Sequence, residues 1–257
     1  MLLAVDIGNT NIVFGCVDND GKILVFERIS TNHNATAAEY AVLIRNILEM
    51  NDFMCGDIHD AIMSSVVPSV TNTVKEAIRK LFGVEVMMAG PGVKTGLNIL
   101  IDNPRQLGSD QAVDAVAAIN EYPTPLIIID MGTATTVSVV DSNKNYLGGL
   151  IFTGMGVSTE ALINRTAQLP KIDFELPPNI IGRNTIDCMK SGSLYSNACA
   201  LDGIIERIEA EMGESCTAVA TGGLAEVVVP LCNKKVILDK DLLIKGLAII
   251  YNKNKKK

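Results

Sequence analysis

The sequence predicts an α/β protein that contains two copies of one domain. An apolar run, Leu2–Val5, ends at Asp6 and is followed by a turn rich in Gly, Asn and Thr before a second apolar run begins. The same order recurs near the middle of the chain, where Leu126–Ile129 ends at Asp130 and leads into a Gly and Thr turn. Short apolar runs bounded by such residues indicate strands and turns. We therefore expect a strand and turn unit that occurs twice.

Either turn alone is typical of a hairpin, because Asp, Gly and Asn tolerate turn geometry. The repetition favours phosphate binding, since a hairpin does not require the same residue order twice. Glycine lets the backbone approach a ligand closely, successive N–H groups can surround an anion, and Thr or Asn side chains add donors. A carboxylate beside phosphates would repel them unless a cation lay between the negative charges. The repeated turn thus predicts a phosphate and cation site.

Hydrophobic spacing and turn signals predict the remaining elements of the first half. Thr36 and Glu39 form a capping-box pattern before a helix. Ser109 or Asp110 would be a good N-cap, so a structural role for Asp110 competes with a chemical one. The predicted strands cover residues 12–17, 22–29, 61–67 and 84–88, and the predicted helices cover residues 37–50, 70–82 and 112–121.

The second half repeats this scheme after the segment Tyr122–Pro125, whose prolines end a helix and mark a seam between domains 1–122 and 123–257. We expect the turns at Asp6 and Asp130 to face each other across a cleft. The predicted strands cover residues 126–129, 135–140, 146–151 and 218–220, and the predicted helices cover residues 157–166, 185–211, with a break near Ser196, and 242–251.

Composition narrows the class of protein. The 257 residues are 48% hydrophobic and 20% charged, as expected for a folded chain with a large core. A net charge of -7 argues against a general nucleic-acid surface, and the basic tail 253–257 is typical of a solvated end. The six cysteines are widely separated and predict reduced core thiols. With neither a signal peptide nor an apolar segment of about 20 residues, we expect a cytoplasmic protein without a membrane span.

Several ordered motifs carry a family resemblance over nearly the whole chain. They are Asp6-x-Gly8-Asn9-Thr10-Asn11, Ser65-Val66-Val67-Pro68, Pro91–Leu97, Asn103-Pro104, Gly108-Ser109-Asp110, Asp130-x-Gly132-Thr133-Ala134-x-Thr136, Gly148-Gly149-x-Ile151, Thr166-Ala167-x-Leu169-Pro170, Gly182-x-Asn184-Thr185 and Thr221-Gly222-Gly223. With these motifs the chain resembles the type III pantothenate kinases of the acetate and sugar kinase, heat-shock chaperone and actin superfamily. The resemblance implies duplicated ribonuclease H-like (actin-like ATPase) domains, with mixed sheets and flanking helices.

The resemblance also implies an activity and its residues. Pantothenate would be phosphorylated by ATP with Mg²⁺, in the first step of coenzyme A biosynthesis, by a homodimer whose site is completed by the partner subunit. Asp110 would accept the proton, Asp6 would lie near the divalent ion, and Asp130 would hold a monovalent cation, K⁺ or NH₄⁺. The implied ATP-binding residues are Asp6, Ile7, Gly8, Asn9, Thr10, Asn11, Ile12, Val13 and Thr133. The implied substrate-binding residues are Gly108, Ser109, Asp110, Gln111, Thr185 and Ile101.

The chain departs from the family pattern mainly on the acceptor side. Gln111 stands where an arginine is usual, and Ile101 stands where a tyrosine is usual. A neutral amide binds a carboxylate more weakly than a guanidinium does, so we expect ordinary nucleotide binding and weakened pantothenate binding. Lys94 or Arg105 could compensate. Thr153 and Ser196 also replace a usual proline and a frequent glycine.

Two other functions are compatible with these departures. The first is an enzyme with the same ATP site and another small hydroxylated acceptor. The second is a non-catalytic accessory regulator, since some relatives have been regarded as accessory factors in transcription. The acidic balance and the intact Asp6, Asp110 and Asp130 weigh against a regulator that binds nucleic acid.

Overall fold

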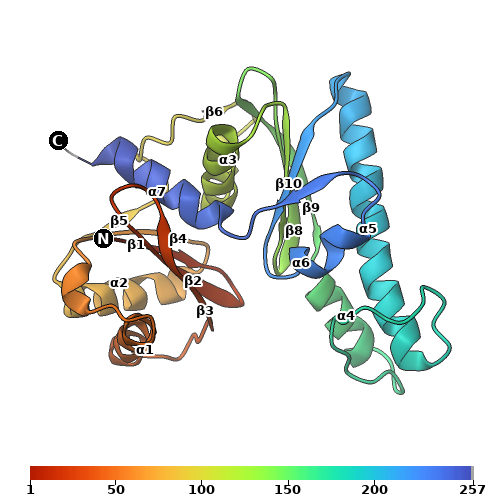
Figure 1. Ribbon diagram of the computed structural model, residues 1–257, viewed down its shortest axis with the longest axis horizontal. Coiled ribbons are helices and arrows are strands. Elements are labelled where there is room, and N and C mark those ends of the chain that lie inside the picture. Colours follow the sequence, from red (N-terminus) through yellow and green to blue (C-terminus); the bar gives the residue numbers. More distant parts are fainter. Residues whose placement is uncertain (256–257) are drawn as a thin grey trace. The chain divides into compact units, whose positions relative to one another are not determined.

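The computed structural model describes residues 1–255, which form two compact units (Figure 1). The first unit contains residues 1–97, 102–120 and the chain from Asp241 onward, and the second contains residues 98–101 and 121–240. The basic-tail residues Lys256 and Lys257 lie outside the described residues. The sequence-based boundaries are wrong for the last helix, which was assigned to the second domain but packs in the first unit.

The first unit is built on a five-stranded sheet with the order β3-β2-β1-β4-β5. Strands β1, β2 and β3 form an antiparallel meander, and β4 and β5 run parallel to β1. The strands are β1 (Leu2–Ile7), β2 (Asn11–Val17), β3 (Ile23–Ser30), β4 (Asp60–Ser65) and β5 (Val86–Met88). The helices are α1 (Ala37–Met50), α2 (Pro68–Phe82), α3 (Ser109–Glu121) and α7 (Leu242–Asn254), with short 3₁₀ turns at Cys55–Asp57 and Pro104–Gln106.

The second unit repeats this topology. Its six-stranded sheet has the order β11-β10-β7-β8-β9-β6, so that β9-β8-β7-β10-β11 corresponds strand by strand to β3-β2-β1-β4-β5. The predicted duplication is confirmed. The elements are β6 (Asn98–Ile99), β7 (Leu126–Met131), β8 (Ala134–Val140), β9 (Asn145–Thr153), α4 (Met155–Asn164), α5 (Thr185–Met212), β10 (Thr217–Thr221), α6 (Ala225–Val228), a 3₁₀ turn (Val229–Leu231) and β11 (Val236–Leu238). The two- and three-residue strands β6 and β11 were not predicted.

Local capping explains where two of the helices begin. The predicted capping box is present, because the Thr36 hydroxyl accepts from the Glu39 N–H at 3.3 Å and the Glu39 carboxylate accepts from the Thr36 N–H at 2.7 Å. The Asn184 side chain caps α5 by accepting from the Asp187 N–H at 2.9 Å. The predicted break near Ser196 is wrong, since α5 is continuous over Thr185–Met212. Burial of its apolar face outweighs the weak helix preference of Ser and Asn there.

The first sheet is covered on both faces. Leu3, Val5 and Ile7 of β1 pack in the cluster that holds α1 and α2, whereas Leu2 and Ala4 pack in the cluster that holds α3 and α7. This alternation follows from the two-residue period of a strand. Central strands buried on both faces leave polar side chains only at their ends.

The apolar face of α5 belongs to the core of the second unit. Leu194, Ala198, Leu201 and Ile205 are each at most 2% exposed and pack against the second sheet. The expectation for the cysteines also holds only in part. All six are free, but only Cys16 is buried, where desolvation raises the pKa of its thiol to about 12. Among residues 1–255, the structure has no helix that combines the length and apolar character of a membrane span.

Two glycines allow α7 to approach the first sheet and α3. A Cβ at Gly15 of β2 would lie 2.5 Å from Cγ2 of Ile244, and a Cβ at Gly246 would overlap the Val113 carbonyl oxygen of α3. Each contact requires the absence of a side chain. The burial of α7 at these two glycines explains why the last helix belongs to the first unit.

We predict that Gly246→Ala lowers the free energy of unfolding by about 1 to 3 kcal/mol, because the new methyl overpacks the α3–α7 contact. The matched control is Gly192→Ala in α5, where no atom lies within 4 Å of the added Cβ. That change should be neutral or stabilising by up to about 1 kcal/mol through helix propensity. Urea unfolding of both variants measures the difference. Equal effects of the two substitutions would contradict the packing explanation.

Candidate functional site

Asp6 lies at the carboxyl end of β1, where the parallel strand β4 brings Ser64 beside it. The fully buried Ser64 hydroxyl donates to Asp6 Oδ1 at 2.6 Å. The next residue of β4, Ser65, accepts through its carbonyl from the Ser109 hydroxyl of α3 at 3.4 Å. The end of β4 therefore links the Asp6 carboxylate to the first turn of α3. Ser64 was not predicted as a site residue, although two serines that end an apolar run are a usable signal.

The turn after Asp6 is closed by backbone hydrogen bonds. The Gly8 N–H donates to the Asn11 carbonyl at 2.9 Å, and a Cβ at Gly8 would lie 3.1 Å from the same oxygen. Thr31 supports the turn from β3, because its hydroxyl donates to the Gly8 carbonyl at 2.6 Å and its N–H donates to the Thr10 carbonyl at 2.9 Å. The side chains of Asn9 and Thr10 are exposed. A ligand that approaches this turn would therefore meet both side chains.

Three other residues of the predicted ATP-binding stretch differ in how far their side chains are exposed to a nucleotide. Ile7 and Ile12 are fully buried in the core, so that only their main chains can contact a nucleotide. Val13 is half-buried and packs against the cluster that contains α7.

The second turn, at the end of β7, is also closed by a glycine N–H but is one residue shorter. The Gly132 N–H donates to the Ala134 carbonyl, two residues ahead, at 3.1 Å, whereas the Gly8 N–H donates to the Asn11 carbonyl, three residues ahead. The Thr133 side chain is exposed, and its carbonyl accepts from the Gly154 N–H at 3.1 Å. Gly222, at a φ of 95°, lies beside Asp130, because a Cβ there would be 2.5 Å from Oδ1. The third glycine turn thus adjoins the second carboxylate.

The oxygen donors at Asp6 and Asp130 fit hard cations such as Mg²⁺ and K⁺. Residues 1–255 contain no group of three or more His, Cys, Asp or Glu side chains that could hold a metal. The remaining ligands would have to be phosphate, water or carbonyl oxygens.

The first turn of α3 carries Gly108–Gln111, but its N-terminus differs from the prediction. The helix begins at Ser109, and the Gly108 carbonyl accepts from the Ala112 N–H at 3.0 Å. Asp110 is therefore inside the helix and is not its N-cap. Its half-buried side chain accepts from the Gln111 N–H at 2.8 Å. A Cβ at Gly108 would overlap Asp110 Oδ1, so a larger residue there would displace the Asp110 carboxylate.

The predicted substrate residue Thr185 lies in a cavity of the second unit, with a volume of about 640 Å³. Helices α4 and α5 and the segment that connects them line this cavity. Side chains with hydroxyl or amide groups dominate its polar lining, and they include Ser158, Thr159, Asn184, Ser193 and Asn197. The cavity suits a small polar molecule with several hydrogen-bonding groups.

Ile101 belongs to the second unit, where its Cγ2 atom lies 3.6 Å from the position of a Cβ at Gly148. Lys94 belongs to the first unit and is held at the C-terminal end of α7. Its N–H donates to the Asn254 side chain at 3.0 Å, and its carbonyl accepts from the same side chain at 2.9 Å. Lys253 adds a hydrogen bond of 2.9 Å to the Thr95 carbonyl.

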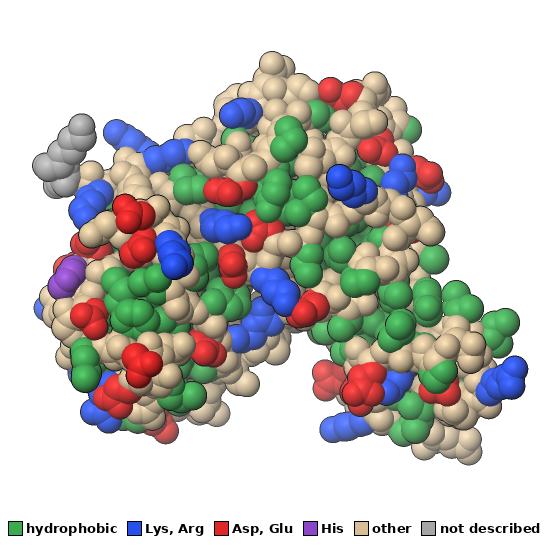
Figure 2. All heavy atoms as spheres, viewed as in Figure 1, with side chains coloured by type: hydrophobic (Ala, Val, Ile, Leu, Met, Phe, Trp, Pro, Cys, Tyr) green, Lys and Arg blue, Asp and Glu red, His purple; other side chains and the backbone are tan. Residues whose placement is uncertain are grey.

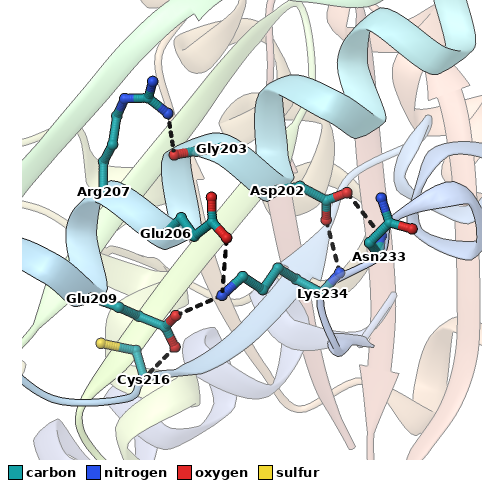
Figure 3. A network of polar contacts seen from close by, with 8 residues as sticks. All are labelled: Asp202, Gly203, Glu206, Arg207, Glu209, Cys216, Asn233 and Lys234. Carbon is teal, nitrogen blue, oxygen red and sulfur yellow. Dashed lines mark hydrogen bonds and ion pairs between the residues drawn. The ribbon is translucent and has the colours of Figure 1, made fainter.

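A polar network holds the segment before β11 against α5 (Figure 3). The Asp202 carboxylate accepts from the N–H groups of Asn233 and Lys234 at 2.8 and 2.9 Å. The Lys234 ammonium donates to Glu209 at 3.0 Å, and Glu209 also accepts from the Cys216 N–H at 3.1 Å. The network therefore fixes the beginnings of the paired strands β10 and β11. The glycine turn beside Asp130 follows the other end of β10. The sequence did not reveal the network.

The duplicated topology, with a carboxylate at the end of the first strand of each sheet, defines the actin-like ATPase fold, which sugar kinases share. A protein from Sinorhizobium meliloti that is provisionally described as a 2-dehydro-3-deoxygalactonokinase matches with a TM-score of 0.61 and 11% identity over 100% of this chain and 98% of its own. A Campylobacter jejuni protein, provisionally described as a Baf family transcriptional activator, matches with a TM-score of 0.59 and 19% identity over 98% of both chains. These likenesses show the fold.

The chain belongs to the type III pantothenate kinase family. The model of that family matches residues 2–207. A relative from an Exiguobacterium species, named Type III pantothenate kinase, is 42% identical over 256 residues, which cover 100% of both chains. The resemblance seen in the motifs is thereby confirmed.

We predict that Glu209→Gln lowers the free energy of unfolding by about 1 kcal/mol at pH 7, because the charged acceptor of the network is lost. The hydrogen bond from Lys234, with that from Cys216, lowers the folded-state pKa of Glu209 below 4.5. The stabilisation is therefore present above pH 4.5 and lost as the pH falls through the folded-state pKa. Urea unfolding at pH 7 and at lower pH measures this.

The control for this prediction is Glu226→Gln. Glu226 pairs with Lys240 at 2.8 Å, but both side chains are at least half exposed. The loss should be smaller than that for Glu209, as is usual for surface ion pairs. If Glu209→Gln has no larger effect than Glu226→Gln, or if its effect persists at low pH, the network does not stabilise the second unit in this way.

Proposed function

We propose that this chain phosphorylates pantothenate with ATP and forms 4'-phosphopantothenate, the first step of coenzyme A biosynthesis. The observation that carries the proposal is the 42% sequence identity, over the full length of both chains, to a relative named Type III pantothenate kinase. The geometry supports it, because Asp6 and the first turn of α3 meet at the end of β4. Asp6, which would bind the cation, and Asp110, which would accept the proton of the substrate hydroxyl, thus belong to one edge of the first sheet.

The turns of the two units would bind the ATP phosphates. Backbone N–H groups of the turns would contact the phosphates, and Asn9, Thr10 and Thr133 have solvent-exposed side chains at the same turns. Asp6 would hold Mg²⁺, which neutralises negative charge on the β- and γ-phosphates when it is bound. Ser64 would orient Asp6 through its hydrogen bond.

Asp130 would hold the monovalent cation. Its carboxylate supplies one oxygen ligand, and the close approach of Gly222 provides neighbouring main-chain groups without steric conflict. A cation at this point would offset the negative charge that phosphate brings to the second turn. The expected consequence is that activity depends on K⁺ or NH₄⁺.

Asp110 would act as the general base. As the hydroxyl oxygen of pantothenate attacks the γ-phosphorus, its proton passes to the Asp110 carboxylate, the bond to the β,γ-bridging oxygen breaks and ADP leaves. Catalysis of this transfer is mostly positioning and charge neutralisation. Gly108, Ser109, Gln111, Ile101 and Thr185 would line the acceptor site.

We predict that Asp110→Asn lowers kcat by about 100-fold or more, while the melting temperature and ATP binding change little. The asparagine side-chain oxygen can still accept from the Gln111 N–H, but the amide cannot take a proton. A coupled ADP-release assay and thermal melting measure the two effects. A variant that keeps its turnover, or that loses its cooperative melt, would assign Asp110 a structural role instead.

We also propose a homodimer in which the second unit supplies the interface. The apolar face of α5 is buried in the core, so another surface must serve. Val157, Leu162, Ile180, Ile181 and Ile186 are 41 to 78% exposed, and Figure 2 shows hydrophobic side chains gathered over the region of α4. Exposed apolar side chains in this number mark an association surface, for which a second copy is the natural occupant in this family.

Light scattering at micromolar concentration should give about twice the 27.5 kDa chain mass. Ile181→Asp should shift the equilibrium toward the monomer and lower activity, because a buried carboxylate without a partner opposes association. Met50→Asp is the control, since Met50 is 81% exposed on the first unit. A monomer mass for the unaltered chain would contradict the homodimer, and an equal effect of both variants would contradict the interface.

A further inference from the structure

The cavity at Thr185 has an unusual charge distribution. Its lining contains one charged side chain, that of Arg183, and no Asp or Glu among the residues that the structure describes. Within residues 1–255, the Arg183 guanidinium forms no ion pair or hydrogen bond. Its five N–H donors are therefore available at the edge of a cavity lined with hydroxyl and amide groups.

Several contacts fix the segment that carries Arg183. A Cβ at Gly182 would overlap the backbone N of Cys188, so the chain approaches α5 more closely than another residue would allow. The Cys188 thiol donates to the Gly182 carbonyl at 3.3 Å, and the Ser191 hydroxyl donates to the Ile180 carbonyl. Because these contacts hold the backbone around Arg183, little backbone entropy would be lost when the residue binds a ligand in the cavity.

The same segment is tied to α5 by Lys190. Its ammonium pairs with Asp173 and, at 3.3 Å, with Glu175, and its side chain is only 13% exposed. Both carboxylates pair with Lys190 and not with Arg183. Among the described residues, Arg183 is the one charged side chain in the lining of the cavity.

Lys94 and Arg105 are the two other cations considered for this role, and both belong to the first unit. Asn254 clamps the backbone of Lys94 beside the end of α7, where Lys255 contacts Asp60 at the beginning of β4. Arg105 lies in the 3₁₀ turn before α3. Neither residue lines the cavity at Thr185.

We propose that Arg183 binds the carboxylate of the acceptor and determines specificity for an acid over a neutral alcohol, in place of the arginine that is absent at position 111. This inference rests on the proposed function and adds a specificity-determining residue to it. A guanidinium can hold a carboxylate through two parallel hydrogen bonds. The hydroxyl and amide groups of the cavity suit the remaining amide and hydroxyl groups of the acceptor.

The test compares two acceptors, pantothenate and pantothenyl alcohol, which lacks the carboxylate. Arg183→Gln should raise KM for pantothenate roughly 10- to 100-fold, the value of a hydrogen bond to a charged group. KM for ATP and kcat/KM for pantothenyl alcohol should stay unchanged. Arg183→Lys should restore part of the loss, since it keeps the charge but not the fork. Arg165→Gln, an exposed position on the same unit outside the cavity, is the matched control.

Three results would overturn the assignment. An unchanged KM for pantothenate in Arg183→Gln would exclude the residue, as would an equal loss for both acceptors, which indicates a structural effect. A rise in KM for pantothenate in Arg105→Gln, with none in Arg183→Gln, would assign the carboxylate to Arg105. If the unaltered chain phosphorylates neither acceptor, the proposed function itself fails. If the unaltered chain phosphorylates pantothenate and Arg183→Gln does not change KM, the assignment of Arg183 fails but the proposed function stands.

Discussion

The parallel pairing of β1 with β4 is the constraint on which the first unit depends. Both strands are buried on both faces, so their polar residues emerge only at the ends that they share. The hydrogen bond of 2.6 Å from Ser64 to Asp6 joins these ends, and Ser65 extends the link to α3. One strand register therefore determines where the turn after Asp6 and the first turn of α3 lie within this unit. A slip of one residue would turn Asp6 to the other face of the sheet.

In the second unit, the parallel pairing of β7 with β10 has the same role. β7 and β10 place Asp130 opposite Thr221, and the glycine turn that follows approaches Asp130 because Gly222 adopts a positive φ. The ion pairs and hydrogen bonds around Glu209 and Lys234 stabilise the outer strands that support this turn. Backbone geometry therefore positions the Gly222 turn beside Asp130. The charge pairs stabilise the opposite ends of β10 and β11.

Acceptor recognition depends on chemistry that a strand register does not determine. The departures at Gln111 and Ile101 remove a guanidinium and a hydroxyl from the family pattern, while the two Asp-x-Gly motifs are intact. The cavity between α4 and α5 brings Arg183 and Thr185 together in one site. The cavity is defined by two helices and the segment between them, and so by contacts that no single motif specifies.

The sequence by itself determined the local structure and the repeat. Period-two and period-3.6 patterns, the Thr36 capping box and the two Asp-x-Gly turns depend on neighbours in the chain, and the motifs identified the family. The residues that only tertiary structure revealed depend on distant partners. The α5 face of Leu194 and Leu201 has the same pattern whether it meets a core or a partner subunit. The membership of α7 in the first unit was decided by Gly15 and Gly246, because close packing is a property of two surfaces and not of one segment.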